Sequence, residues 1–172
     1  MKTAIVYDSI TGNTALLARA LQQEVPEAPC GPVGQVDAAQ AELVCLGFWT
    51  DRGNCSARLQ KFLPTLEGKR IFLFGTAGFG SSPSYFQKVV EQIREELPAS
   101  CRVEDWFMCA GQMPETVRLR YAAMAEDPMM QEKGRAMLRI YDAAVGHPDK
   151  NDAAAAAAKL RQILRRLETE SA

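Results

Sequence analysis

The stretch that decides the fold is residues 4–14, which read Ala4-Ile5-Val6-Tyr7-Asp8-Ser9-Ile10-Thr11-Gly12-Asn13-Thr14. The apolar residues 4–7 predict a strand, and leucines at helical spacing predict a helix over residues 14–25. A strand, a short loop and a helix N-terminus form a natural site for an anion, because backbone N–H groups converge there. The hydroxyls of Ser9, Thr11 and Thr14 and the amide of Asn13 add neutral donors.

This loop contains neither lysine nor arginine, and it matches neither the GxxxxGK[ST] nor the GxGxxG nucleotide pattern. Neutral donors alone suit a single terminal phosphate that is held away from bulk water. The alternative is that Thr11 to Thr14 only cap the following helix, since Thr and Asn are good caps. The position directly after the first strand favours a ligand, because open α/β sheets bind ligands at the carboxyl ends of their strands.

Four further apolar runs predict strands over residues 43–48, 71–74 and 103–109, and a weaker edge strand over residues 33–36. The runs over residues 43–48 and 71–74, like residues 4–7, are nearly continuous, which is typical of strands that are covered on both faces of a parallel sheet. The run over residues 103–109 is broken by Glu104 and Asp105 and could lie nearer an edge. Helical patterns separate them, over residues 14–25, 57–66 and 84–97. Strands that alternate with helices predict an α/β fold with a doubly wound parallel sheet.

The last third of the chain, from about residue 114 to residue 172, has a helical pattern throughout. It predicts one helix that starts at Pro114 and breaks at Asp127-Pro128, a second that ends near Val145, and a third over residues 152–167. We find no internal repeat and no domain boundary, so we expect a single domain over residues 1–172. Five of the seven methionines lie between Met113 and Met137. They either fill gaps where helices pack together or form an adaptable surface that docks a redox partner or covers the flavin.

Composition excludes several function classes. The chain has 172 residues, 24% of them charged, and a net charge of −1, which argues against a nucleic-acid binder. With no signal-peptide pattern and no apolar stretch of about 20 residues, we expect a cytoplasmic protein without a membrane span. A single histidine, His147, and five cysteines without a CxxC pair argue against a metal site. Cys55 precedes the predicted second helix, whose dipole could lower its pKa.

On the motif [ST]-x-T-G-N-T after the first strand, which Ser9 to Thr14 match in full, the chain resembles the flavodoxin family. In that family this loop holds the phosphate of FMN. The resemblance covers about residues 1–110. It implies five parallel strands in the order 2-1-3-4-5, FMN at their carboxyl ends, and one- or two-electron transfer by the flavin itself.

Two later loops, residues 47–53 and 74–80, resemble more closely a branch of flavodoxin-like proteins from anaerobic bacteria. Some members of that branch accompany a larger flavin-dependent reductase, the bilirubin reductase of gut bacteria among them. The loops carry aromatics that we expect to be exposed and to stack on the flavin ring, and glycines that let the backbone approach it. The predicted FMN-binding residues are Ser9, Ile10, Thr11, Gly12, Asn13, Thr14, Phe48, Trp49, Thr50, Asp51, Gly53, Thr76, Ala77, Gly78, Phe79 and Gly80.

The chain departs from the family pattern in three respects. The family commonly has Gly-x-x-Thr-Trp after strand three, whereas Trp49 here precedes Thr50. Pro83 stands where many members have a stacking tyrosine, so Phe79 or Trp49 must take its place. Flavodoxins are typically strongly acidic, and a net charge of −1 predicts a weaker electrostatic field at the flavin.

The resulting prediction is an FMN-binding electron carrier that accepts electrons from a reductase and passes them to a partner oxidoreductase, without a catalytic residue of its own. One alternative is an FMN-dependent NAD(P)H reductase of a quinone or another small molecule. A second is a flavin-free member whose loop binds another phosphate or caps a helix. A third is an accessory subunit that docks a flavin-dependent reductase through its helical C-terminal segment. The sequence leaves the oligomeric state open.

Overall fold

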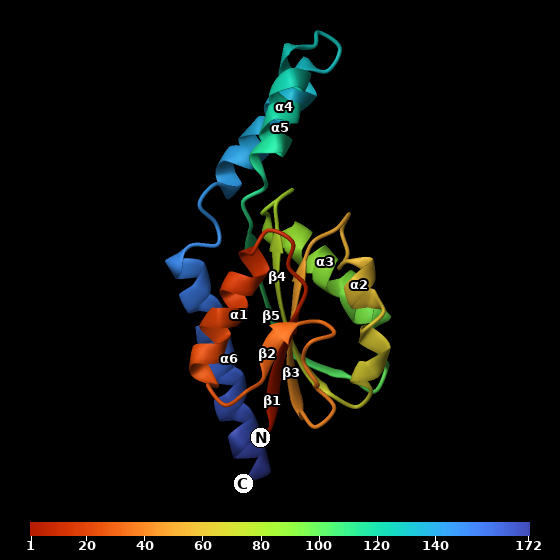
Figure 1. The fold of residues 1–172 in the computed structure, drawn as a ribbon, viewed down its shortest axis with the longest axis vertical. Helices are drawn as coiled ribbons and strands as arrows, with labels where there is room; N and C mark the ends of the chain where they lie inside the picture. Colours follow the sequence, from red (N-terminus) through yellow and green to blue (C-terminus); the bar gives the residue numbers. More distant parts are fainter.

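Five parallel strands form the centre of the structure, a computed structural model that describes all residues from 1 to 172. Their order in the sheet is β2-β1-β3-β4-β5, as predicted (Figure 1). Their bounds are β1 Thr3–Tyr7, β2 Cys30–Pro32, β3 Leu43–Trp49, β4 Arg70–Ala77 and β5 Arg102–Ala110. Because all strands run the same way, the loops after β1, β3, β4 and β5 meet at one edge of the sheet.

Two hydrophobic clusters, one on each face, explain why the strand sequences are almost continuously apolar. Successive strand residues point to opposite faces, so Ile5 packs in one cluster and its neighbour Val6 in the other. Helices α1 (Asn13–Glu24) and α6 (Lys150–Ser171) cover the first face. Helices α2 (Ala57–Gln60) and α3 (Pro83–Glu96), with a 3₁₀ turn over Leu63–Leu66, cover the second (Figure 1).

Two predicted elements differ from the structure. The edge strand lies at Cys30–Pro32, not at residues 33–36, because Gly34 has a φ of 87° and turns the chain there. The helix predicted over residues 57–66 is split into α2 and the 3₁₀ turn. Pro64 lacks the N–H that a continuous helix would need at that place, so the α-helix ends before it.

Helices α4 (Glu115–Glu126) and α5 (Gln131–Ala144) form a hairpin that projects from the carboxyl edge of the sheet, far from both termini (Figure 1). We call this hairpin the arm. Its two helices pack mainly against each other. Gly134 lets them approach closely, since a Cβ at this position would overlap the backbone of Ala125. The break predicted at Asp127-Pro128 is confirmed as the tip of the arm.

No helix of this structure combines the length and the apolar character that crossing a membrane requires.

Candidate functional site

A cavity of about 280 Å³ lies at the carboxyl edge of the sheet, against the N-terminus of α1. Ten of the residues predicted to bind FMN line it, namely Ser9, Ile10, Thr11, Asn13, Thr14, Trp49, Thr50, Thr76, Gly78 and Phe79. Six others lie outside the lining, namely Gly12, Phe48, Asp51, Gly53, Ala77 and Gly80. The fold therefore brings three loops, far apart in the sequence, around one cavity.

The loop between β1 and α1 presents unused backbone donors. None of the N–H groups from Ser9 to Thr14 donates a hydrogen bond within the protein. Gly12, with a φ of 90°, is the N-cap residue of α1 and has no side chain with which to cap it. A helix start with free N–H groups and a favourable dipole is suited to an anion. This observation fits a phosphate that neutral donors hold.

Two side chains of this loop, which line the cavity, also form hydrogen bonds within the protein. The Thr14 hydroxyl lies 3.2 Å from the carbonyl oxygen of Phe48, to which it can donate, and 3.2 Å from Oγ1 of Thr76. The Asn13 amide donates to the carbonyl oxygen of Gln112 at 3.0 Å. Both groups thereby join the loop to neighbouring segments. The second N–H of the Asn13 amide and the hydroxyls of Ser9 and Thr11 remain as side-chain donors for a ligand, although Ser9 Oγ also accepts from the Ala15 N–H at 3.3 Å.

The three aromatic residues of the prediction have different environments. Phe79 is 48% exposed at the rim of the cavity, and Trp49 is half-buried in its wall. Phe48 is completely buried, so the expectation that it is exposed is wrong. Strand alternation turns it into the core, where it lies against Gly75 at a place that a Cβ would fill.

Four lining residues come from the loop after β5, which the prediction missed: Gly111, Gln112, Met113 and Pro114. Met113 lies against Gly78, where a Cβ would overlap its side chain. The Gln112 N–H donates to the carbonyl oxygen of His147 at 2.8 Å, and Oε1 of Gln112 accepts from the Gly146 N–H at 2.9 Å. The signal was available, because the loop after every parallel strand reaches the same edge.

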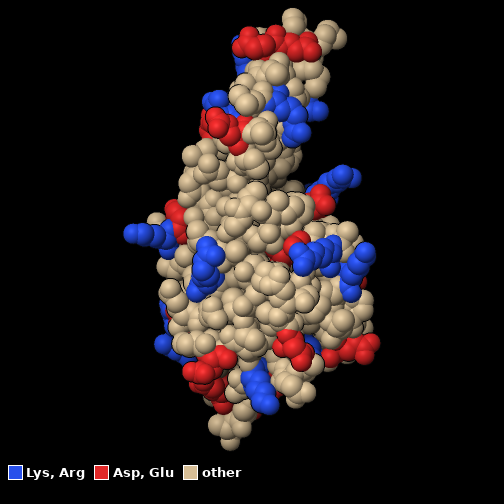
Figure 2. All heavy atoms as spheres, in the orientation of Figure 1, with Lys and Arg blue, Asp and Glu red and all other residues tan.

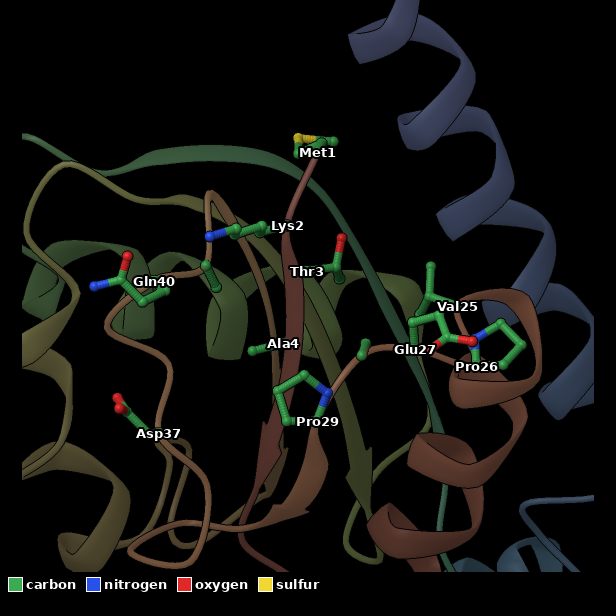
Figure 3. Close-up of a pocket in the computed structure, with 12 residues that line it drawn as sticks. Met1, Lys2, Thr3, Ala4, Val25, Pro26, Glu27, Pro29, Asp37 and Gln40 are labelled. Carbon is green, nitrogen blue, oxygen red and sulfur yellow. The ribbon is translucent and has the colours of Figure 1, made fainter.

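A larger cavity, of about 530 Å³, lies at the opposite edge of the sheet, beside the amino end of β1 (Figure 3). Its charged side chains, Lys2, Glu27 and Asp37, come from separate segments and form no ion pair with one another. Figure 3 shows them on both sides of β1. Because no set of donors converges there, we place the functional site at the smaller cavity.

Two residues that lie outside the cavity, Cys55 and His147, have raised pKa values. Burial, with smaller contributions from Glu96 and Asp8, raises the pKa of the Cys55 thiol to about 12. The expected lowering is therefore wrong, since α2 is a single short turn and the thiol is buried. A 2.7 Å contact with the Asp152 carboxylate raises the pKa of His147 above its ordinary value.

Comparisons with known proteins place this geometry in a family. The model of a family described as a flavodoxin domain matches residues 4–161. A flavodoxin-like domain-containing protein, BilS, of Clostridium symbiosum is 37% identical over 175 residues, which cover 90% of this chain and 92% of that protein. BilS of Clostridioides difficile is 28% identical over 158 residues, which cover 88% and 90%. A flavoprotein of Lactobacillus acidophilus, solved in complex with FMN, has a similar fold, with a TM-score of 0.53 and 14% identity over 63% of this chain and 93% of that one.

Proposed function

Since this chain belongs to the flavodoxin domain family, we propose that it binds FMN without a covalent bond at the carboxyl edge of its sheet and carries electrons between two proteins. The donor would be a reductase and the acceptor a partner oxidoreductase. When bound, FMN supplies one- or two-electron transfer through its ring. The protein supplies the binding, the orientation and the surroundings of that ring.

The loop from Ser9 to Thr14 would hold the phosphate through its free N–H groups. A doubly charged phosphate normally attracts lysine or arginine, but the lining of this cavity contains neither. The hydroxyls of Ser9 and Thr11 supplement the backbone donors. The bonds of Asn13 and Thr14 to the neighbouring strands keep the loop in place, so little order has to be gained when a ligand arrives.

Apolar walls for the ring come from Trp49, Phe79 and Met113. The loop after β3 is fastened to β4, because both the N–H and the hydroxyl of Thr50 donate to the carbonyl oxygen of Thr76, each at 2.9 Å. A cavity of about 280 Å³ lies just below the usual range of ligand pockets, which is roughly 300–1,000 Å³. An edge of the ring would therefore remain at the surface, where a partner protein can reach it.

One observation favours a carrier over an enzyme: no residue that lines the cavity has an acidic or basic side chain. General acid–base chemistry needs such a group within hydrogen-bonding reach of the substrate. Electron transfer through an exposed ring edge needs none. The absence of these groups from the lining supports a role in which the chemistry belongs to the cofactor.

The accessory-subunit alternative is favoured by the arm. Its helices project from the same edge as the cavity and leave Leu119 62% and Met129 89% exposed. A hairpin that packs mainly against itself gains little from the core of its own protein. Docking of a reductase on the arm would place that partner beside the ring, which is compatible with electron transfer.

Steady-state reduction of cytochrome c by NADPH separates a carrier from an NAD(P)H reductase. The FMN-loaded protein alone should give no reduction above background, and adding a flavodoxin reductase should give a rate proportional to the amount of carrier. Rapid oxidation of NADPH by the protein alone would instead establish the enzyme. A control with Trp106→Phe, on β5 outside the cavity, should behave as the unchanged protein does.

A further inference from the structure

Asp8 is a buried carboxylate next to the cavity, and the proposed binding of FMN gives it no role. It directly follows β1, does not itself line the cavity, and is 6% exposed. Burial of an ionised carboxylate is costly unless donors satisfy its oxygens. The side chains that donate hydrogen bonds to Asp8 therefore indicate which parts of the protein it positions.

Three side chains from two later segments converge on this carboxylate. The indole Nε1 of Trp49 donates to Oδ2 at 2.9 Å, and the hydroxyl of Ser56 donates to the same oxygen at 2.6 Å. The guanidinium of Arg58 lies 3.7 Å from Oδ1 and is largely exposed. Asp8 thus joins the end of β3 and the start of α2 to the end of β1.

The bond to Trp49 fixes the orientation of an aromatic wall. An indole has one polar atom, a donor, so a single acceptor determines how the ring turns about its side-chain bonds. Phe79, the other aromatic residue of the lining, has no polar atom and is 48% exposed. Trp49 is therefore the aromatic residue whose position the protein controls before any ligand binds.

We propose that Asp8 is a positioning residue that holds the indole of Trp49 with its face toward the flavin ring. This inference rests on the proposed binding of FMN. A carboxylate suits the task, because one of its oxygens accepts from both Trp49 and Ser56. Ser56 in turn accepts from the N–H of Leu59 at 3.2 Å, so α2 braces the carboxylate from the far side.

The first test needs no ligand. In a Trp106→Phe background Trp49 is the sole tryptophan, and acrylamide quenching of its emission measures its accessibility. Asp8→Ala should raise the quenching constant of the FMN-free protein at least about twofold, because the indole loses its acceptor. Asp8→Asn keeps a carbonyl acceptor and should restore most of the protection. Ser56→Ala removes the brace of the carboxylate but leaves the acceptor of the indole, so it should raise the quenching constant less than Asp8→Ala does.

The second test is a double-mutant cycle on FMN affinity. Asp8→Ala should weaken FMN binding about tenfold, which corresponds to the loss of one well-placed interaction. In a Trp49→Phe background the same change should alter the affinity by less than about twofold, because Asp8 then has no ring to position. Thermal unfolding of each variant, followed by circular dichroism, shows whether the fold is intact.

The outcomes separate this inference from the proposed function. If the unchanged protein takes up no FMN, the proposed function fails and the inference fails with it. If FMN binds but Asp8→Ala leaves both the quenching and the affinity unchanged, the inference alone is overturned. An equal loss of affinity with and without Trp49 also overturns it, since Asp8 would then act through its charge and not through the indole.

Discussion

Thr14 would serve two purposes in the proposed phosphate loop, through different atoms. Its backbone N–H is free at the start of α1, while its completely buried hydroxyl joins the helix to β3 and β4. A buried hydrogen bond contributes about 1 kcal/mol to stability, and leaving a buried acceptor unpaired costs about 1–3 kcal/mol. The hydroxyl thus contributes to the stability of the sheet edge, and the N–H has no partner within the protein, as the proposed phosphate site requires.

Replacement of Thr14 and of Thr11 should separate these two purposes. Thr14→Val should lower the free energy of unfolding by about 1–3 kcal/mol, measured by urea denaturation. Thr11→Val changes an exposed hydroxyl that has no partner in the protein, so it should leave stability within about 0.5 kcal/mol and weaken FMN binding. A Thr14→Val protein as stable as the unchanged one would contradict the structural role of the hydroxyl.

The sequence motif predicted which loop residues surround the cavity, but not the direction of each side chain. Phe48 and Trp49 are neighbours in the sequence, yet one lies in the core and the other in the cavity wall. Which of two adjacent strand residues faces the core depends on the register of β3, which pairs Phe48 with Gly75 on β4. Asp8 was missed because a lone acidic residue after a strand gives no hint of its later partners.

The close packing of the two helices of the arm depends on Gly134. Gly134→Ala should push α4 and α5 apart, because the added Cβ would meet the backbone of Ala125. Amide hydrogen exchange should therefore become faster over residues 115–144, while FMN binding and exchange in the sheet stay unchanged. Lys133→Ala, at the adjacent exposed position, is the matched control and should leave the arm protected. Unchanged exchange in Gly134→Ala would show that the hairpin does not need the close approach.

The start of α6 should respond to pH through His147. The contact with Asp152 raises the pKa of this imidazole, so the folded state binds its proton more tightly than the unfolded chain does. The stabilisation is fully present below the unfolded pKa of about 6.5 and is lost as the pH rises through the folded value. His147→Gln should therefore flatten the fall in unfolding free energy above pH 6.5. If His147 instead made the unchanged protein more stable as the pH rises, the raised pKa of His147 would be refuted.

The edge strand β2 and the C-terminal helices show which parts of the fold the sequence pattern could not predict. The main strands of the sheet follow from apolar runs, because parallel strands must bury both faces, whereas their order was predicted from the resemblance to the flavodoxin family. The edge strand was misplaced, since three residues around glycine and proline carry too little pattern. The C-terminal helices were predicted, but not that α4 and α5 leave the sheet, while α6 packs on it. That difference depends on what each helix packs against: α6 buries Leu160, Ile163 and Leu167, whereas α4 buries little beyond Tyr121.

For the whole molecule, the unusual property is a surface without the acidic excess typical of flavodoxins. The net charge is −1, and Figure 2 shows basic and acidic side chains distributed together over the visible face. Negative charge around a flavin disfavours the addition of electrons, so a weaker field favours reduction. We expect the reduction potential of bound FMN to be less negative than in strongly acidic flavodoxins, in a redox titration with reference dyes. A potential as low as theirs would contradict this expectation.

The most direct test of the account compares FMN with riboflavin, which lacks the phosphate, in fluorescence titrations of the flavin-free protein. The free N–H groups from Ser9 to Thr14 should make FMN bind at least about a hundredfold more tightly, since charge-assisted hydrogen bonds contribute about 1.5–3 kcal/mol each. FMN uptake should also produce the absorption bands of a bound flavin. Equal affinities for the two compounds, or no uptake of either, would contradict the account.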